Sequence, residues 1–414
     1  MRGKIERVIV VGAGPVGLLT ALFLGQRGIA VDVVEASDKV NDSPRGLAYG
    51  SAAVSVLSRA GILNKVIERG YVPADVSWRR PNGEFIVGFQ VPKISLSGLP
   101  SIVMLPVGSL SPLLVEEIQK LDNVTLNWNH RVLGTGQDEN QAWVEVEVEE
   151  QGSKVTKRMT AHFVIGCDGG SSAVRKSIFG SNFPGWTWHK QLVVVNAYMN
   201  FDGLNLSDIQ WVVDPENWYV IGQINKKGLW RLVYGETLGL SVQEIKDRLP
   251  ERLRRTLPGN PEPGQYQIAN VTPYVCHQRC VEKMRVGRIL LAGDAAHLNN
   301  PMGGLGLTTG ICDVGSLVDC LFGIGGGHAS LDILDKYDQE RRRIFNEVVD
   351  GLSTANFRRI MQDPDQFIEK DPSYKLMMAS RGNATMSAAQ QQVDQSLGCD
   401  LTRFYDKPIA FGQE

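Results

Sequence analysis

The sequence predicts an α/β protein in which a parallel-sheet domain is interrupted by a mainly antiparallel sheet domain and followed by a helical C-terminal region. Three observations predict this fold. A strand, a glycine turn and a helix open the chain at 8–27, and a second buried strand runs into glycines at 289–310. Between them, residues 182–275 read as a series of strands and hold five of the eight tryptophans. At 414 residues the chain is long enough for two domains.

The first 70 residues read as a strand–turn–helix–strand unit. The β-branched run at 8–11 suits a parallel strand buried on both faces, and leucines at helical spacing follow at 16–27. The next strand is predicted at 29–35, which completes a unit of about 30 residues. A single helix is then expected at 52–69.

The chain from 71 to 181 mixes short strands with one helix. Residues 142–149 alternate apolar residues with glutamate over most of their length, which indicates a strand with one face in water. The predicted elements are strand-like patches within 71–104, a helix at 111–121, strands at 124–131, 142–149 and 154–161, and a buried strand at 163–166.

A sheet of mainly antiparallel strands is predicted next, at 192–201, 209–213, 218–224, 229–234 and 265–274, with a short helix at 241–249. The strand at 289–292 returns to the first domain, and the chain from 308 onward is mostly helical. We therefore expect a discontinuous first domain at 1–70, 105–181 and 276–360, a sheet domain at 71–104 and 182–275, and a helical or irregular tail at 361–414.

Composition narrows the class of protein. The chain is 43% hydrophobic and 21% charged with a net charge of −2, so nothing indicates nucleic acid or an anionic membrane as a partner. No apolar run approaches the ~20 residues of a spanning helix. The arginines at 341–343 are expected on a solvated helix face. Cys276 and Cys280 lack a second ligand pair, so no metal site is predicted, and the six cysteines are expected to be reduced in a cytoplasmic protein.

The first glycine turn predicts a site for an adenine dinucleotide. Gly12, Gly14 and Gly17 allow a tight bend and a close approach to pyrophosphate, and the helix that begins with Pro15 and Val16 offers free N–H groups. Glu35 and Ala36 end the second strand, where an acid binds ribose hydroxyls and disfavours a 2′-phosphate.

Two later motifs make the prediction specific. Asp168, Ser172 and Arg175 lie in CDGGSSAVR, and Gly293-Asp294 is followed by Pro301 and by Gly303-Gly304-Leu305-Gly306. With the first turn, these motifs make residues 5–350 resemble the FAD-dependent aromatic hydroxylases, the single-component group A flavoprotein monooxygenases similar to para-hydroxybenzoate hydroxylase. The first domain is then expected to be a Rossmann-like FAD-binding domain.

The resemblance implies roles for these residues. Asp294, beside Gly293, would bind the ribityl hydroxyls, and Pro301 with residues 303–307 (Gly303, Gly304, Leu305, Gly306 and Leu307) would line the flavin ring. Asp168 and Arg175 would lie near the FAD pyrophosphate and the nicotinamide donor, and Arg45 would contact the cofactor. For Asp168 an ordinary helix N-cap is an equal alternative. The chain departs from the family pattern at Leu305 and Thr308, where glutamine and asparagine are common.

The implied activity is a monooxygenation. NAD(P)H would reduce FAD, O₂ would form a flavin hydroperoxide, and an electron-rich phenolic or polyketide-like aromatic would be hydroxylated. Trp211, Tyr219, Arg231 and Tyr234 are the candidates for the substrate pocket, with Pro301 at the flavin side; no catalytic base is assigned.

Several alternatives stay open. Epoxidation or Baeyer–Villiger oxidation could use the same scaffold. A halogenase is less favoured because Trp186-Thr187-Trp188 lacks the Ile-Pro that would complete the halogenase motif. A non-enzymatic FAD-binding protein, and either a monomer or a homodimer, also remain.

Overall fold

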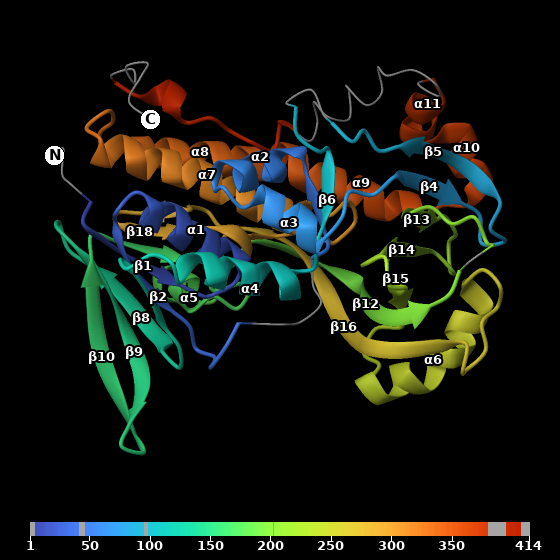
Figure 1. Ribbon diagram of the computed structural model, residues 1–414, viewed down its shortest axis with the longest axis horizontal. Helices are drawn as coiled ribbons and strands as arrows, with labels where there is room; N and C mark the ends of the chain where they lie inside the picture. Colours follow the sequence, from blue (N-terminus) through green and yellow to red (C-terminus); the bar gives the residue numbers. More distant parts are fainter. Residues whose placement is uncertain (1–4, 41–45, 95–97, 202, 380–394, 407–414) are drawn as a thin grey trace.

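The computed structural model describes residues 5–40, 46–94, 98–201, 203–379 and 395–406. Two sheets lie side by side, and the long helices α7 (Leu305–Gly325) and α8 (Ile333–Ile344) run along one side of the first (Figure 1). The Rossmann-like fold with a second, mainly antiparallel sheet is therefore confirmed.

The first sheet has six strands in the order β17-β18-β11-β1-β2-β7. All neighbours are parallel except β17 and β18. The carboxyl ends of β1, β11 and β18 therefore meet at one edge, and the three predicted motifs follow these three strands directly. The bounds are β1 (Arg7–Val11), β2 (Ala30–Val34), β7 (Val124–Asn127), β11 (Phe163–Gly166), β17 (Arg285–Val286) and β18 (Ile289–Leu291).

Helices cover this sheet and extend beyond it. The helix expected at 52–69 is in fact two, because Gly61 adopts a φ of +74° that ends the first and turns the chain into the second. The α7 helix is long and apolar enough to cross a membrane, but most of it is buried inside this protein. The remaining bounds are α1 (Pro15–Gln26), α2 (Ser51–Arg59), α3 (Leu63–Arg69), α4 (Val107–Ile118), α5 (Ala173–Phe179), η1 (Gly293–Ala295), the π-helix η2 (Phe345–Val349), α9 (Asp350–Ile360), α10 (Pro364–Lys370), α11 (Pro372–Ala379) and η3 (Thr402–Phe404).

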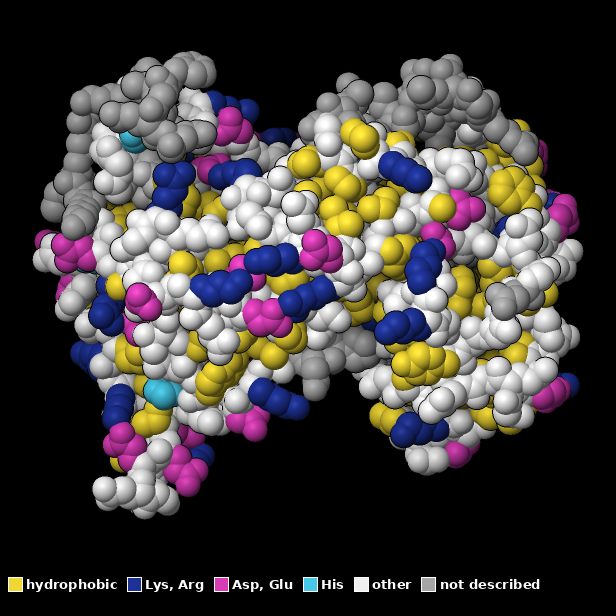
Figure 2. Space-filling view, in the orientation of Figure 1, with side chains coloured by type: hydrophobic (Ala, Val, Ile, Leu, Met, Phe, Trp, Pro, Cys, Tyr) yellow, Lys and Arg dark blue, Asp and Glu magenta, His cyan; other side chains and the backbone are white. Residues whose placement is uncertain are grey.

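A three-stranded sheet projects from the first domain, made of β8 (Arg131–Gln137), β9 (Ala142–Glu150) and β10 (Ser153–Ala161). Its outer surface carries cross-strand ion pairs such as Lys154–Glu147 at 2.8 Å, and Figure 2 shows charges of both signs on this projection. The single strand expected at 124–131 is wrong. Asn129, with φ +58°, turns the chain between β7 and β8, which belong to different sheets.

The second large sheet has eight strands in the order β19-β16-β12-β15-β14-β13-β4-β5, antiparallel except where β13 meets β4. Its bounds are β4 (Asp75–Arg79), β5 (Phe85–Gln90), β12 (Gly185–Met199), β13 (Ile209–Val212), β14 (Tyr219–Gln223), β15 (Leu229–Glu236), β16 (Tyr266–Cys280) and β19 (His297–Leu298). The pair β3 (Ala48–Gly50) and β6 (Ile102–Met104) lies near the junction of the two sheets (Figure 1).

One face of the eight-stranded sheet is covered by α6 (Val242–Thr256). A capping box of Ser241 and Glu244 begins this helix, and it continues through Pro250, beyond the end expected at 249. Because strand side chains alternate between faces, the residues packed on α6 leave every second position for the opposite face. That opposite face is a wall of the candidate site.

Candidate active site

A cavity of about 2050 Å³ is lined by residues of both large sheets. It reaches from the first glycine turn to the loop before α7, and from there along the strands of the second sheet. Of the residues predicted to bind cofactor or substrate, those on its wall are Gly14, Pro15, Val16, Arg175, Trp211, Arg231, Gly293, Asp294, Pro301, Gly303, Gly304, Leu305, Gly306 and Leu307. Arg45 lies outside the described residues; the adjacent Gly46 and Leu47 line the cavity.

Of the three glycines of the first turn, two permit close packing of the backbone and one leaves open space. A Cβ on Gly12 would lie 2.6 Å from the carbonyl oxygen of Cys167, and one on Gly17 would lie 2.0 Å from the carbonyl oxygen of Gly12. Both glycines therefore permit close backbone packing. Gly14 has an ordinary φ of −75°, and a Cβ there would meet nothing within 4 Å. This middle glycine, on the cavity wall at the start of α1, leaves room for a ligand.

The Glu35 carboxylate is held beside the same turn. Its Oε2 accepts a hydrogen bond from the backbone N–H of Ala13 at 2.8 Å, and its Oε1 accepts one from Ser37 at 2.9 Å. Ala36 is exposed next to it. The carboxylate is thus oriented by the turn, at the position where a ribose would be expected.

Asp168 acts as a helix cap in this structure. Its carboxylate accepts hydrogen bonds from the hydroxyl of Ser172 and from the backbone N–H groups of Ala173 and Val174 at the start of α5. Burial raises the pKa of Asp168, although these hydrogen bonds oppose the rise. Ser172 is itself the N-cap residue of α5, and Asp168 adds capping hydrogen bonds from four residues earlier, so the geometry supports a capping role for Asp168.

Arg175 turns from the same helix toward the cavity. Its guanidinium donates to the carbonyl oxygens of Gly170 at 2.7 Å and Ala295 at 3.2 Å, and lies 3.9 Å from the ring centre of Phe183. Burial lowers its pKa. This side chain joins the β11 corner to the β18 corner.

The β18 corner and the following loop form the other end of the cavity. Asp294 is exposed on the cavity wall, whereas its neighbours Gly293 and Ala295 are buried. Gly303 and Gly304 have φ values of +106° and +68°, and Gly304 is the N-cap of α7. Residues of the first turn of α7 line the cavity, so the positive end of this 21-residue helix lies there. The turn contains no acidic residue that would offset this charge.

Sequence reasoning missed the residues that hold this loop. The Thr308 hydroxyl donates to the carbonyl oxygen of Gly304 at 3.1 Å and accepts from the N–H of Gly50 at 3.3 Å. Asn300, fully buried, donates through its backbone N–H and side-chain amide to the side chain of Gln278. Gln278 in turn donates to Asp350 of α9 at 2.5 Å. The sequence indicates Thr308 only as a departure from the family pattern, and it assigns no role to Asn300 or Gln278.

The structure places two of the four candidate pocket residues of the second sheet on the cavity wall and the other two in the core. Trp211 and Arg231 lie on the cavity wall with Val220 and Val233. Tyr219 and Tyr234 instead pack in the core beneath α6. They pair with each other across β14 and β15, and alternation along these strands turns both away from the cavity. Burial raises the pKa of Tyr234 to about 12.

Arg231 is a buried cation in this wall. Its Nε donates to Asn196 Oδ1 at 3.1 Å, and its Nη1 donates to the carbonyl oxygen of Gly46 at 3.2 Å. Burial lowers its pKa to about 10, which leaves it charged at neutral pH. Tyr274, on the neighbouring β16, lines the same cavity.

A second group of polar residues lines the cavity near β16, and the sequence had not indicated it as a group. Arg279 donates to the Phe183 carbonyl oxygen at 3.0 Å and to Thr187 Oγ1 at 3.2 Å. The Nδ1 atom of His277 lies 2.9 Å from the same hydroxyl. Burial lowers the pKa of His277, and the nearby charge of Arg279 adds to this effect.

The residues present fit FAD. One continuous cavity connects a glycine that leaves open space at a helix N-terminus with an exposed carboxylate and a second helix N-terminus. A long dinucleotide has matching parts: a pyrophosphate for the first, ribityl hydroxyls for the carboxylate, and a flavin ring for the last.

The fold and this site define an FAD-dependent aromatic monooxygenase, and the chain belongs to that family. Residues 6–351 match the family model for an FAD binding domain. The chain is 41% identical over 373 residues to para-nitrophenol 4-monooxygenase of Pseudomonas sp. (strain WBC-3), covering 90% of this chain and 91% of that protein.

Two further comparisons agree. The chain is 35% identical over 358 residues to 6-hydroxy-3-succinoylpyridine 3-monooxygenase HspB of Pseudomonas putida (strain DSM 28022 / S16), covering 86% and 89% of the two chains. The crystal structure of p-nitrophenol 4-monooxygenase PnpA from Pseudomonas putida DLL-E4 superposes with a TM-score of 0.87 at 37% identity, covering 95% and 98%. The protein is thus an FAD enzyme that takes electrons from NAD(P)H and hydroxylates an aromatic ring, and the epoxidase and Baeyer–Villiger alternatives are not favoured.

Proposed function

We propose that this enzyme adds one oxygen atom of O₂ to a single-ring phenol at a substituted carbon para to the hydroxyl group. The substituent leaves that carbon with the electron pair of its bond, so that a quinone forms, and the second oxygen atom leaves as water with two electrons from NAD(P)H. The observation that carries the proposal is Arg231, a buried cation on the cavity wall beside Val220 and Val233. The names of both relatives place the oxygenated carbon para to a hydroxyl, at positions 4 and 1 of one ring and 3 and 6 of the other. This substrate is smaller than the polyketide-like compounds that the sequence also allowed.

Arg231 would hold the substrate as a phenolate. An electron-withdrawing para substituent makes a phenol more acidic, so the anion can arrive from solution without a protein base. A charge-assisted hydrogen bond from the guanidinium would then fix the oxygen of the ring. Trp211, Val220 and Val233 would cover the ring and keep water from it.

The other end of the cavity would hold the cofactor. Gly14 and the start of α1 would bind the pyrophosphate, Glu35 the ribose, and Asp294 the ribityl hydroxyls. The N-terminus of α7 would favour negative charge at the flavin edge. FAD, when bound, supplies the transfer of one oxygen atom from O₂ to the ring, with electrons from NAD(P)H.

We also propose that Arg175 and Arg279 attract the phosphates of NAD(P)H. Both line the cavity, and both guanidiniums lie near the ring of Phe183, at 3.9 and 5.9 Å from its centre. Each charge raises the local positive potential around the other, and a phosphate approaching between them would relieve this repulsion.

The two sheets support the predicted division into domains, 1–70, 105–181 and 276–360 against 71–104 and 182–275, with the tail at 361–414. The exceptions are β16, which continues to Cys280, β19, which joins the second sheet from within 276–360, and β6, which lies within 71–104 but pairs with β3 of the first domain. A cytoplasmic location and a monomeric or homodimeric state stay predictions.

Asp294→Ala and Asp294→Asn test the cofactor assignment. Both variants are expected to be purified with at most about a tenth of the wild-type FAD content, because the ribityl chain loses a charge-assisted hydrogen bond. Flavin absorbance of the purified proteins measures this. Wild-type flavin content in both variants would refute the role of Asp294.

Products formed under ¹⁸O₂ test the reaction. With a para-substituted phenol, the label should appear once, on the ring carbon that carried the substituent. Label on a neighbouring carbon, or no oxygen uptake in response to any para-substituted phenol, would contradict the proposal while leaving the fold and cofactor in place.

A further inference from the structure

A buried charged cluster lies directly behind the Gly293–Asp294 corner. Asp313, on α7, is fully buried. Its Oδ2 accepts hydrogen bonds from the backbone N–H of Gly293 at 2.9 Å and from Nε2 of His297 at 2.7 Å, and its Oδ1 accepts one from Arg341 Nε at 2.6 Å. Burial alone would raise the pKa of Asp313, but the charges of His297 and Arg341 and their hydrogen bonds bring it below its usual value.

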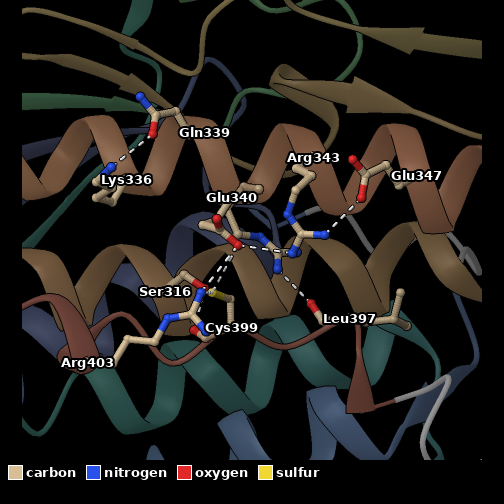
Figure 3. Close-up of polar contacts among 10 residues, drawn as sticks. Ser316, Lys336, Gln339, Glu340, Arg343, Glu347, Leu397, Cys399 and Arg403 are labelled. Carbon is tan, nitrogen blue, oxygen red and sulfur yellow. Dashed lines mark hydrogen bonds and ion pairs between the residues drawn. The ribbon is translucent and has the colours of Figure 1, made fainter.

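Arg341 continues this cluster to the end of the chain. It was expected on a solvated face, yet it is fully buried. Its Nη1 donates to the carbonyl oxygen of Leu397 at 2.6 Å, and its Nη2 donates to that of Thr309 at 3.3 Å. Arg343, two residues later, lies at the surface and pairs with Glu340 and Glu347 (Figure 3).

Residues 395–406, here called the C-terminal strap, run along α7 and α8. Ser316 donates to the carbonyl oxygen of Cys399 at 3.0 Å, and Arg403 pairs with Glu340 at 3.5 Å (Figure 3). The Leu397 side chain is fully buried and lines the cavity, in the same apolar cluster as Leu305 at the start of α7. The strap therefore contributes to the wall of the candidate site.

The corner has little freedom to move independently of this cluster. Gly293 has a φ of +61°, and a Cβ there would lie 3.0 Å from Val16. A Cβ on Gly310 of α7 would lie 2.9 Å from Val16 and 3.3 Å from the Cα of Gly293. The corner is thus packed between α1 and α7, and Asp313 fixes its one backbone N–H from behind.

We infer that Asp313 and Arg341 are positioning residues for the flavin, and that they couple the C-terminal strap to the Gly293–Asp294 corner. The inference rests on the proposed cofactor role of Asp294. FAD bound at the corner favours the position in which Gly293 meets Asp313, and Arg341 transmits that preference to Leu397. Coupling of this kind is reciprocal, so FAD should protect the strap as the strap supports FAD.

The experiment compares wild type, Arg341→Lys and the matched surface control Arg343→Lys. Hydrogen exchange of residues 395–406 is measured on each protein with FAD bound and after removal of FAD, and the dissociation constant of FAD is measured by titration onto the stripped protein. In wild type and Arg343→Lys, FAD should slow strap exchange. In Arg341→Lys, that slowing should disappear, and the dissociation constant should rise about tenfold or more because a buried charge-assisted hydrogen bond is lost.

Two results would overturn the inference. Strap exchange in the wild type could be the same with and without FAD, a measurement that needs no variant to fold. Alternatively, Arg341→Lys could match Arg343→Lys in both readouts, with any loss confined to the melting temperature of the stripped protein, which is the mark of a purely structural role. Retention of FAD by Asp294→Ala would instead refute the proposed role of Asp294. The exchange experiment on the wild type is a separate test, because it measures the coupling between FAD and the strap directly.

Discussion

At the scale of single residues, the central feature is a buried cation on the cavity wall. Arg231 is held by Asn196 and Gly46 from two different parts of the chain, so its direction is fixed before any ligand arrives. A phenolate in the cavity would meet a guanidinium that is already oriented, which lowers the cost of ordering on binding.

Arg231→Met is expected to raise the KM for a para-substituted phenolate by about 10- to 100-fold, because a hydrogen bond to a charged group is worth about 1.5–3 kcal/mol. Steady-state kinetics measure this. Tyr234→Phe, on the opposite face of β15, is the control and should leave KM unchanged. An unchanged KM in Arg231→Met would contradict the proposed role.

The same residue predicts a pH dependence. The guanidinium carries its charge below its lowered pKa of about 10 and loses it above. In wild type, kcat/KM for a substrate already ionised at neutral pH should therefore fall as pH rises through about 10. Arg231→Met should lack this fall, because it has no group to titrate there. A wild-type profile that stays level to pH 11 would contradict the assignment of the phenolate to Arg231.

At the scale of elements, two glycines of the first turn differ in role: one is needed for packing and the other for binding. Gly17 permits contact between α1 and the backbone of Gly12, whereas Gly14 faces open space in the cavity. The two glycines lie on the same turn, so substitutions at them form a matched pair. The substitution at Gly17 should damage the fold, and the substitution at Gly14 should damage only the site.

Gly14→Ala should keep the stability of the FAD-free protein within about 0.5 kcal/mol and weaken FAD binding about tenfold or more, since its φ of −75° suits alanine and its Cβ would occupy ligand space. Gly17→Ala should destabilise the protein by about 2 kcal/mol or more, because its Cβ meets backbone. Denaturant unfolding and FAD titration of both variants measure this. Full FAD affinity in Gly14→Ala would show that the pyrophosphate does not approach this glycine.

Elements with strong local sequence patterns could be predicted from the sequence. The contacts that these elements make with distant parts of the chain could not. The buried run of β1, the alternation of β9 and the glycine turn carry their structure in adjacent residues. The break at Gly61 and the turn at Asn129 depend on single left-handed residues that do not interrupt a hydrophobic pattern. The faces of Tyr219 and Tyr234 depend on where α6 packs, and the burial of Arg341 depends on Asp313, 28 positions away. Such long-range contacts leave no local signal.

At the scale of the whole molecule, the cavity is lined by two segments that are far apart in the sequence and adjacent in the fold. The first turn follows β1, and the loop before α7 follows β18, with the second sheet inserted between them in sequence. A ligand that reaches both segments adds to the contacts that already join them through the first sheet and through α1 and α7. The stability gained on binding should therefore depend on both ends at once.

Ligands that reach only one end test this. FAD at 100 times its dissociation constant should stabilise the wild type by about 2.7 kcal/mol, measured as a rise in melting temperature. ADP at the same concentration, which has only the adenine and pyrophosphate parts and should bind more weakly, should give a smaller rise. In Gly14→Ala, the responses to FAD and to ADP should both fall. In Asp294→Ala, the response to FAD should fall to the level given by ADP, while the response to ADP stays as in wild type. If Asp294→Ala abolishes the response to ADP, Asp294 acts through the fold rather than through the flavin half, and the single cofactor spanning both ends would lose its support.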